Sequence, residues 1–285
     1  MIHNGTDVPL LPRQAFKGYN SVIYTVCDNG GAGMERAEWL QEMRSMAEVL
    51  YDQVSPQYWV SFGLSEDGTH RAFLQKFLEL VAPGVILSAA CGAGRYEDLL
   101  LEAGHSVVGI DQSAGMLARA REHFPEAQYP QLRYEKMGLQ EMAFSEAFDG
   151  IICMDAMEHI CPEDYPGILR AFQEALKPGG VLYFTADTTD TAVLEKVDVA
   201  VVYERARKCG LPVVPGEAVD GIDEAYEHVK TLGQPVPGDL ADRAVYHYYP
   251  PVEQVRAWIN QAGLAIEEEG MGSAWHHFLT RKKKD

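Results

Sequence analysis

The chain has 285 residues, of which 47% are hydrophobic and 23% charged. This composition excludes a disordered, collagen-like or coiled-coil protein, and a chain of this size can bury a core without metals or disulfides. Its 42 acidic and 24 basic residues give a formal net charge of −18. This charge argues against nucleic acid, which is bound by clustered Lys and Arg, and favours a small neutral or cationic substrate.

The cysteines and the apolar segments indicate the compartment. Five cysteines are widely spaced, without a Cys-x-x-Cys pair, so we expect neither a disulfide framework nor a zinc ribbon. Reduced thiols are typical of the cytoplasm. No apolar run approaches the roughly 20 residues of a membrane span, and we detect no signal-peptide pattern. We therefore expect a cytoplasmic protein with no membrane partner.

Two helices are predicted before the main domain. Apolar residues, Trp39 among them, recur at three- and four-residue steps over 34–54, which indicates a helix with one core-facing side. A second helix is predicted over 69–81, with Leu80 among its inward-facing residues. We assign residues 1–80 to an N-terminal helical cap.

Short apolar strands then alternate with helices, and this region, 81–186, is the predicted cofactor-binding core. Strands are predicted at 85–90, 106–111, 132–137, 148–154 and 181–186, and helices at 95–103, 113–124 and 164–176. Ser113 is a suitable N-cap for the second of these helices. Such alternation predicts an α/β fold with a parallel sheet and right-handed crossovers.

The alternation stops after residue 186. We interpret 187–249 as a helical lid insertion with helices at about 191–208 and 217–231 and no convincing strand. Residues 250–285 are predicted to complete the core with a C-terminal helix and a β-hairpin. The helix covers 252–262, and the hairpin strands cover 264–271 and 275–281.

The strongest chemical motif lies where the first strand of the core ends. Small residues at Ala90, Gly92 and Gly94 let the backbone approach a ligand closely, and a helix begins directly afterwards. Asp111 ends the next strand, where a carboxylate can accept both hydrogen bonds of a ribose diol. Together these residues predict a nucleoside site at the carboxyl ends of the strands.

These motifs resemble those of the class I S-adenosylmethionine-dependent methyltransferases. The resemblance covers 82–186 and 250–281 and rests on the following segments: Cys91-Gly92-Ala93-Gly94, Gly109-Ile110-Asp111, Phe148-Asp149-Gly150-Ile151-Ile152, Glu158-His159, Leu176-Lys177-Pro178-Gly179-Gly180 and Gln261-Ala262-Gly263-Leu264. It implies a Rossmann-like, doubly wound seven-stranded sheet whose last strand is antiparallel. It also implies S-adenosylmethionine at the glycine turn.

The resemblance assigns cofactor contacts to particular residues. Asp111 is expected on the ribose hydroxyls, with Gln112 and Met116 beside the nucleoside. The full predicted cofactor set is Tyr51, Arg71, Ala90, Gly92, Gly94, Asp111, Gln112, Met116, Gly138, Leu139 and Met154. Tyr51 is assigned to the methionine carboxylate, with Arg71 as the alternative partner, and the backbone of Gly138 and Leu139 to the adenine.

The sequence departs from the family pattern at two places near the glycine turn and the third strand. Ser88 stands where the family usually has an acid that helps to hold the methionine end, and Ala90 stands where it usually has Gly. Near the end of the third strand, Met137-Gly138-Leu139-Gln140 lacks the acid that often contacts the adenine amine.

A dinucleotide such as NAD is the nearest rival ligand. It favours Gly-x-Gly-x-x-Gly, and the third glycine is missing after Gly94. Glu97 and Asp98 would also repel a pyrophosphate, whereas an acidic site suits a sulfonium cation.

Asp155-Ala156-Met157-Glu158-His159 follows the fourth core strand, at the mouth of the site. Three alternatives stay open. Asp155, Glu158 and His159 form a carboxylate–imidazole metal site, His159 alone is a general base or substrate orienter, or the segment is a hydrogen-bonded loop. Our main prediction names His159 as the catalytic residue and no metal.

The predicted substrate residues lie just before the C-terminal helix. Tyr246, His247 and Tyr249 suit an aromatic wall above a sulfonium or a substrate ring. His276 and His277 lie on the last strand, where alternation sends them to opposite faces.

We therefore expect an enzyme that transfers a methyl group from S-adenosylmethionine to an O or N, or else a C, nucleophile of a small-molecule metabolite. One alternative is a metal-assisted O-methyltransferase that uses Asp155, Glu158 and His159. A second alternative is a non-catalytic scaffold or sensor that only binds S-adenosylmethionine.

Overall fold

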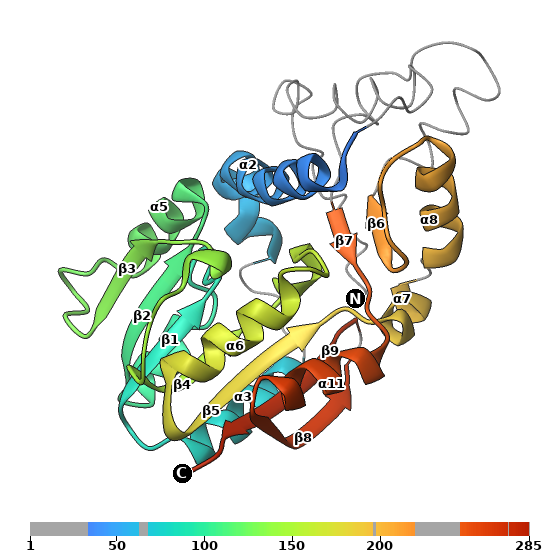
Figure 1. Ribbon diagram of the computed structural model, residues 1–285. Coiled ribbons are helices and arrows are strands. Elements are labelled where there is room, and N and C mark those ends of the chain that lie inside the picture. The colour runs from blue at the N-terminus through green and yellow to red at the C-terminus, as the bar shows by residue number, and fades with distance from the viewer. Residues whose placement is uncertain (1–33, 63–67, 196–197, 220–245, 273, 285) are drawn as a thin grey trace, which may run out of the picture.

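A seven-stranded sheet organises the chain in the computed structural model, which describes residues 34–62, 68–195, 198–219, 246–272 and 274–284 (Figure 1). Its strand order is β3-β2-β1-β4-β5-β9-β8. The strands are β1 (Val85–Ala89), β2 (Ser106–Asp111), β3 (Leu132–Lys136), β4 (Phe148–Cys153), β5 (Leu176–Ala186), β8 (Leu264–Met271) and β9 (His276–Lys282). Strands β1 to β5 are parallel, and β9 is inserted antiparallel between β5 and β8. The predicted Rossmann-like sheet with an antiparallel last strand is confirmed.

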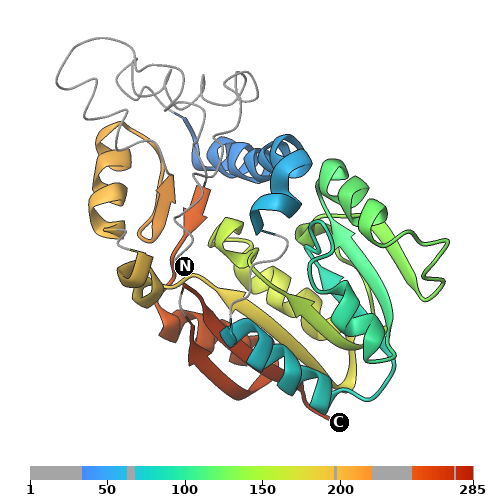
Figure 2. The same cartoon turned by 180° about the vertical axis from the view of Figure 1, so that it is seen from behind.

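Helices cover both faces of this sheet, α6 and α11 on one and α3 on the other (Figures 1 and 2). The helices are α2 (Arg36–Phe62), α3 (Gly68–Leu80), α4 (Glu97–Glu102), α5 (Ala114–His123), α6 (Tyr165–Ala175), α7 (Thr189–Glu195), α8 (Val199–Lys208) and α11 (Val252–Gln261), with single turns η1 (Leu139–Glu141) and η2 (Met157–His159). Helices α4 and α5 share the α3 face. None of the described helices combines the length and apolar character that crossing a bilayer requires.

The two-layer cover explains why the strands read as unbroken apolar runs. In β1, Ile86 faces the α3 side and Leu87 faces the α6 side, and neither side chain is exposed. A strand that is buried on both faces has no polar positions to alternate with. Trp39 of α2 is fully buried in the core cluster on the α6 side, as predicted.

Local signals set several helix ends as predicted. The Ser113 side chain accepts the backbone N–H of Met116 at 3.0 Å and so caps α5. Gly263, at φ +82°, follows α11, where a left-handed residue ends a helix. Helix α2 is longer than the predicted 34–54 and runs through Pro56 to Phe62.

The structure corrects three details of the prediction. A short strand, β6 (Glu217–Val219), replaces the start of the predicted helix over 217–231 and pairs with β7 (Tyr246–Tyr248); residues 220–231 lie outside the described part of the chain. Strand β5 begins at Leu176 rather than 181 because Leu176 already pairs with Phe148. Leu80 is 41% exposed because α3 ends there.

Candidate active site

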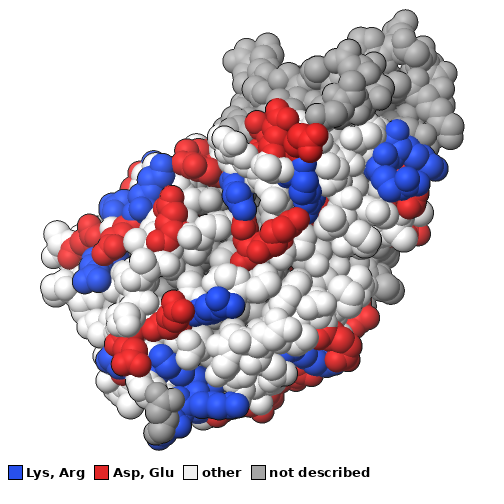
Figure 3. All heavy atoms as spheres, viewed as in Figure 1, with Lys and Arg blue, Asp and Glu red and all other residues white. Residues whose placement is uncertain are grey.

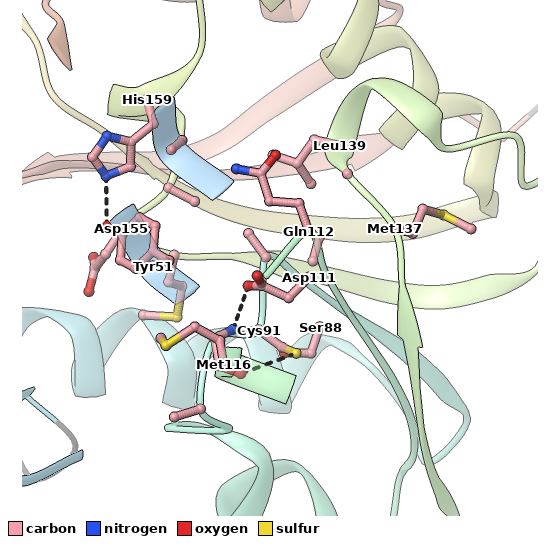
Figure 4. Close-up of a pocket in the computed structure, with 18 of the residues that line it drawn as sticks. Tyr51, Ser88, Cys91, Asp111, Gln112, Met116, Met137, Leu139, Asp155 and His159 are labelled. Atoms are coloured by element: carbon pink, nitrogen blue, oxygen red, sulfur yellow. Dashed lines mark hydrogen bonds between the residues drawn. The ribbon is translucent and has the colours of Figure 1, made fainter. Parts of the chain in front are cut away.

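A pocket lies at the carboxyl ends of β1, β2 and β4, where the strand order reverses and where open α/β sheets bind ligands. Its wall is built from the loops that follow these strands, and helix α2 crosses above them (Figures 1 and 4). Most of the predicted cofactor residues line it. These are Tyr51, Ala90, Gly92, Asp111, Gln112, Met116, Gly138, Leu139 and Met154.

The turn after β1 is tight because it uses left-handed backbone. Ala90, Gly92 and Gly94 have φ values of +50°, +56° and +84°. A Cβ added at Gly92 would lie 3.1 Å from the Cε atom of Met116. A side chain at Gly92 would therefore crowd Met116, and of the two glycines only Gly92 lines the pocket. The left-handed φ of Ala90 also explains why glycine suits this position.

Asp111 joins the glycine turn to α5. Its Oδ2 accepts the N–H of Gly92 at 2.9 Å (Figure 4), and its Oδ1 accepts the N–H of Ser113 at 2.8 Å. Burial raises the pKa of this carboxyl to about 6, and the two backbone N–H groups oppose the rise. The carboxylate is thus fixed in position and charged at neutral pH, with lone pairs left to accept hydroxyl groups.

Beyond Asp111, the pocket is lined by the amide of Gln112 and by the segment Met137–Gln140 (Figure 4). At this end Arg44 of α2 forms a two-pronged ion pair with Asp164, with distances of 2.7 and 2.6 Å. This pair ties α2 to the residue that precedes α6.

His159 is held in one tautomer by two partners. Its Nδ1 lies 3.0 Å from the carbonyl oxygen of Tyr246, which can only accept a hydrogen bond, so we assign the ring proton to Nδ1. Its Nε2 then accepts the O–H of Tyr51 at 2.7 Å (Figure 4). Burial lowers the pKa of His159. Burial is also the largest cause that raises the pKa of Tyr51 well above its ordinary value. Both side chains are therefore neutral at pH 7.

Asp155 is the centre of a second polar group in the pocket. It adopts a left-handed φ of +53°, and its N–H donates to Thr185. One carboxylate oxygen lies 2.7 Å from His70 Nε2, and the other accepts Nη1 of Arg95 at 2.8 Å. Strained backbone of this kind persists where the surroundings fix it, often at functional sites.

Several predicted site residues lie elsewhere. Arg71 is exposed on α3 and does not line the pocket. The Tyr246 hydroxyl donates to Glu217 at 2.6 Å, so only its carbonyl reaches His159. Tyr249 packs in a separate small cluster with residues of the segment 187–219. Among the three predicted substrate residues only the His247 side chain adjoins the site, where its ring stacks on His159 at 5.1 Å.

The alternative metal site at Asp155, Glu158 and His159 is not supported. Asp155 is engaged by His70 and Arg95, and both ring nitrogens of His159 have partners. Within the described ranges, no three His, Cys, Asp or Glu side chains are grouped so as to hold a metal ion. His276 and His277 are both buried, and only His277 contacts Phe73 and Tyr183, as expected for opposite faces.

The doubly wound sheet, the glycine turn and the acid at the end of β2 together define a nucleoside-binding α/β domain. Residues 86–180 match a family model described as a methyltransferase domain. This match and this fold confirm the prediction of a class I S-adenosylmethionine-dependent methyltransferase domain over these residues.

Individual relatives agree with this assignment. The chain is 34% identical over 107 residues to the ubiquinone biosynthesis O-methyltransferase of Albidiferax ferrireducens. This aligned segment covers 37% of this chain and 42% of that protein. The enzyme of the same name from Acinetobacter baylyi is 32% identical over 102 residues, or 35% and 42% of the two chains. The matched segment thus spans less than half the length of these curated relatives.

Solved structures share the fold over most of the chain. A DhpI–SAM–HEP complex has a TM-score of 0.58 at 15% identity and covers 87% of this chain and 100% of its own. A SAM-dependent methyltransferase of Methanosarcina mazei has a TM-score of 0.56 at 13% identity, with 75% and 98% covered. At this level of identity the likeness concerns the fold.

Proposed function

We propose that this protein transfers a methyl group from S-adenosylmethionine to a hydroxyl group of a small molecule, with His159 as the general base. The observation that carries the proposal is the fixed tautomer of His159, whose unprotonated Nε2 lies at the pocket wall beside Tyr51. The names of the curated relatives, which are O-methyltransferases, support oxygen as the acceptor.

The residues of the pocket fit the cofactor. Asp111 offers a fixed carboxylate for a ribose diol, and Gly92 leaves the space that a Cβ would fill. Gln112 and the backbone of Gly138 and Leu139 line the end where the base would lie. When bound, S-adenosylmethionine supplies a methyl group on a sulfonium sulfur, which is activated for attack by a nucleophile.

Tyr51 and His159 can together remove the proton of an acceptor hydroxyl. A hydroxyl hydrogen-bonded to Tyr51 Oη passes its proton to that oxygen, while Tyr51 passes its own proton to His159 Nε2. The Nδ1–H group, held by the Tyr246 carbonyl, keeps the ring in position as it becomes charged. General base catalysis of this kind contributes about 10²- to 10⁴-fold to a rate.

The enclosed position of the pocket below α2 supports a small acceptor rather than a nucleic acid. Basic and acidic side chains alternate on the face shown in Figure 3, and no continuous basic surface covers its described part. The four cysteines in the described part of the chain are free thiols, which supports a cytoplasmic location.

The test combines binding with turnover. Calorimetry should show binding of S-adenosylmethionine and of its demethylated product, S-adenosylhomocysteine. A collection of phenols, alcohols and amines is then screened for formation of S-adenosylhomocysteine. Binding without turnover on any acceptor would favour the non-catalytic alternative, and absence of binding would refute the proposal.

His159→Asn tests the base once an acceptor is known. We expect the affinity for S-adenosylhomocysteine to stay within a few-fold while turnover falls about 10²-fold or more. His123→Asn, at the end of α5 and outside the pocket, is the matched control and should retain activity. Turnover that is unchanged in His159→Asn would exclude His159 as the base.

A further inference from the structure

The pocket holds two side chains of opposite charge that the proposed methyl transfer has not yet used, Arg95 and Asp155. Arg95 directly follows the glycine turn after β1, and Asp155 follows β4 by two residues. Their side chains meet at 2.8 Å on the pocket wall. The sequence places them 60 residues apart, so only the sheet topology brings them together.

This ion pair differs from the Arg44–Asp164 pair, whose arginine lines the same pocket. The Arg95 and Asp155 side chains are 14% and 13% exposed, and buried ion pairs stabilise a fold little because both charges lose their hydration. The Arg44 side chain, by contrast, is 42% exposed, and its Nε and Nη2 groups donate to the two carboxylate oxygens of Asp164. The burial of the Arg95–Asp155 pair in a ligand pocket therefore calls for a reason other than stability.

Arg95 is positioned to receive an anion. Its Nη groups donate to the hydroxyls of Tyr58 and Tyr96 at 3.2 Å, and it lies over both rings. Its Nε–H has no acceptor among the residues that the structure describes, so the guanidinium keeps donor capacity. Two aromatic side chains and one carboxylate thus fix the plane of the guanidinium and leave its Nε–H available to a ligand.

Asp155 is positioned in the same way as an acceptor for a cation. The contacts of its backbone with Thr185 and of its carboxylate with His70 fix a left-handed conformation at the end of β4. Position 88, at the end of β1, is a serine and carries no charge. The Ser88 side chain is 3% exposed and hydrogen-bonds to the buried Glu97. Ser88 therefore brings no charge to the pocket at the end of β1.

We propose that Arg95 and Asp155 form the receptor for the zwitterionic amino-acid end of the cofactor. The Arg95 guanidinium binds the α-carboxylate, and the Asp155 carboxylate binds the α-ammonium group. Charge-assisted hydrogen bonds of this type are shorter and stronger than neutral ones. His70 is a positioning residue that orients Asp155. The inference rests on the proposed function, because it assigns one end of the same cofactor.

Two ligands that share a nucleoside test the assignment by calorimetry. S-adenosylhomocysteine carries the amino-acid end, whereas 5′-methylthioadenosine has the same nucleoside thioether without it. We expect Arg95→Met and Asp155→Asn each to weaken S-adenosylhomocysteine binding about 10- to 100-fold, as loss of a charged hydrogen bond predicts. Binding of 5′-methylthioadenosine should stay within about threefold, which also shows that the variants are folded.

A third ligand separates the two roles. Decarboxylated S-adenosylhomocysteine keeps the ammonium group and lacks the carboxylate, so its affinity should fall in Asp155→Asn and not in Arg95→Met. Arg44→Met, at the opposite end of the pocket, is the matched control and should weaken all three ligands by similar factors or none.

The outcomes separate the two proposals. Equal losses for S-adenosylhomocysteine and 5′-methylthioadenosine in Arg95→Met would overturn the zwitterion receptor, as would unchanged affinity for S-adenosylhomocysteine. In either case the proposed methyl transfer would stand. A wild-type protein that binds none of the three ligands would refute the proposed function itself.

Discussion

Two aspartates at opposite ends of the sheet should respond in opposite ways to neutralisation. Asp111 sits at the carboxyl end of β2, where burial raises its pKa to about 6 against two backbone hydrogen bonds. Asp149 sits near the start of β4 and is bonded to Lys177 and the N–H of Val85. Burial alone would raise the pKa of Asp149, but these partners together lower it. The charge of Asp111 therefore costs folding energy at neutral pH, whereas that of Asp149 contributes stability.

The magnitude for Asp111 follows from its pKa. The difference between its ordinary value of 3.8 and about 6 corresponds to about 3 kcal/mol. This contribution is present below pH 3.8 and is lost as the pH rises through 6. Asp111→Asn removes that loss but leaves the N–H of Gly92 or Ser113 facing an amide, which costs about 1–3 kcal/mol. At pH 7.5 the variant should thus be between unchanged and about 2 kcal/mol more stable.

Asp149→Asn serves as the matched control. Its side chain is 32% exposed, so after allowance for solvent screening we expect a loss of about 1 kcal/mol or less at pH 7.5. The contribution of Asp149 is present above pH 3.8 and disappears as the pH falls through the lowered pKa. Urea unfolding at pH 7.5 and pH 4.5 measures both effects.

Cofactor affinity should separate the two variants further. Asp111→Asn exchanges a charged acceptor for a neutral one and should weaken S-adenosylhomocysteine binding by about 1.5–3 kcal/mol, while Asp149→Asn should leave it unchanged. Calorimetry at pH 7.5 gives both values. If Asp111→Asn bound as tightly as wild type, or lost more than about 2 kcal/mol of stability at pH 7.5, the reasoning from burial and ribose binding would be refuted.

Three other substitutions test the structure around the site. Burial raises the pKa of Glu97 to about 7 against a hydrogen bond to a serine, so the urea midpoint of wild type should fall from pH 6 to 8.5 more steeply than that of Glu97→Gln. Ala90→Gly should leave the stability nearly unchanged, because the relief of about 1 kcal/mol of left-handed strain is offset by the greater chain entropy of glycine in the unfolded state. Ala89→Gly in β1 lacks that relief and should cost about 0.5–1 kcal/mol. Thermal melts of the two variants measure the difference in stability. Arg36→Met leaves a fully buried glutamate without its ion-pair partner and should lower the free energy of unfolding by about 3 kcal/mol or more. Arg207→Met should have no measurable effect on urea unfolding.

The parts of the fold that the sequence predicts are those with local causes. The bounds of β2 and β8 agree with the prediction, because β2 is a buried apolar run and β8 lies between glycines at positions 263 and 272. Ser113 caps α5 through a contact three residues away. The glycine turn and Asp111 are likewise readable, because one strand–turn–helix–strand unit brings them together.

The parts that the sequence does not predict depend on contacts between distant segments. Tyr51 and His159 are 108 residues apart, and no periodicity indicates that one hydroxyl meets one imidazole. Strand β6 is three residues long, too short for a pattern. In the sequence, Arg71 and Arg95 are equal candidates for a cation that binds a carboxylate. Only the path of the backbone after the glycine turn places Arg95 on the pocket wall.

One turn of helix α2 links the two ends of the site. Tyr51 contacts the proposed base, and the next residue, Asp52, accepts the hydroxyl of Ser113 at 2.6 Å and the N–H of Gly115 at 2.8 Å. The approach is so close that a Cβ at Gly115 would lie 2.5 Å from a serine hydroxyl of α2. Since Asp111 also bonds to Ser113, the same loop holds the proposed ribose acceptor and anchors the helix that carries Tyr51. The proposed nucleoside binding and proton removal therefore share one structural support, and we expect the effects of mutations at Asp111 and Tyr51 not to be additive.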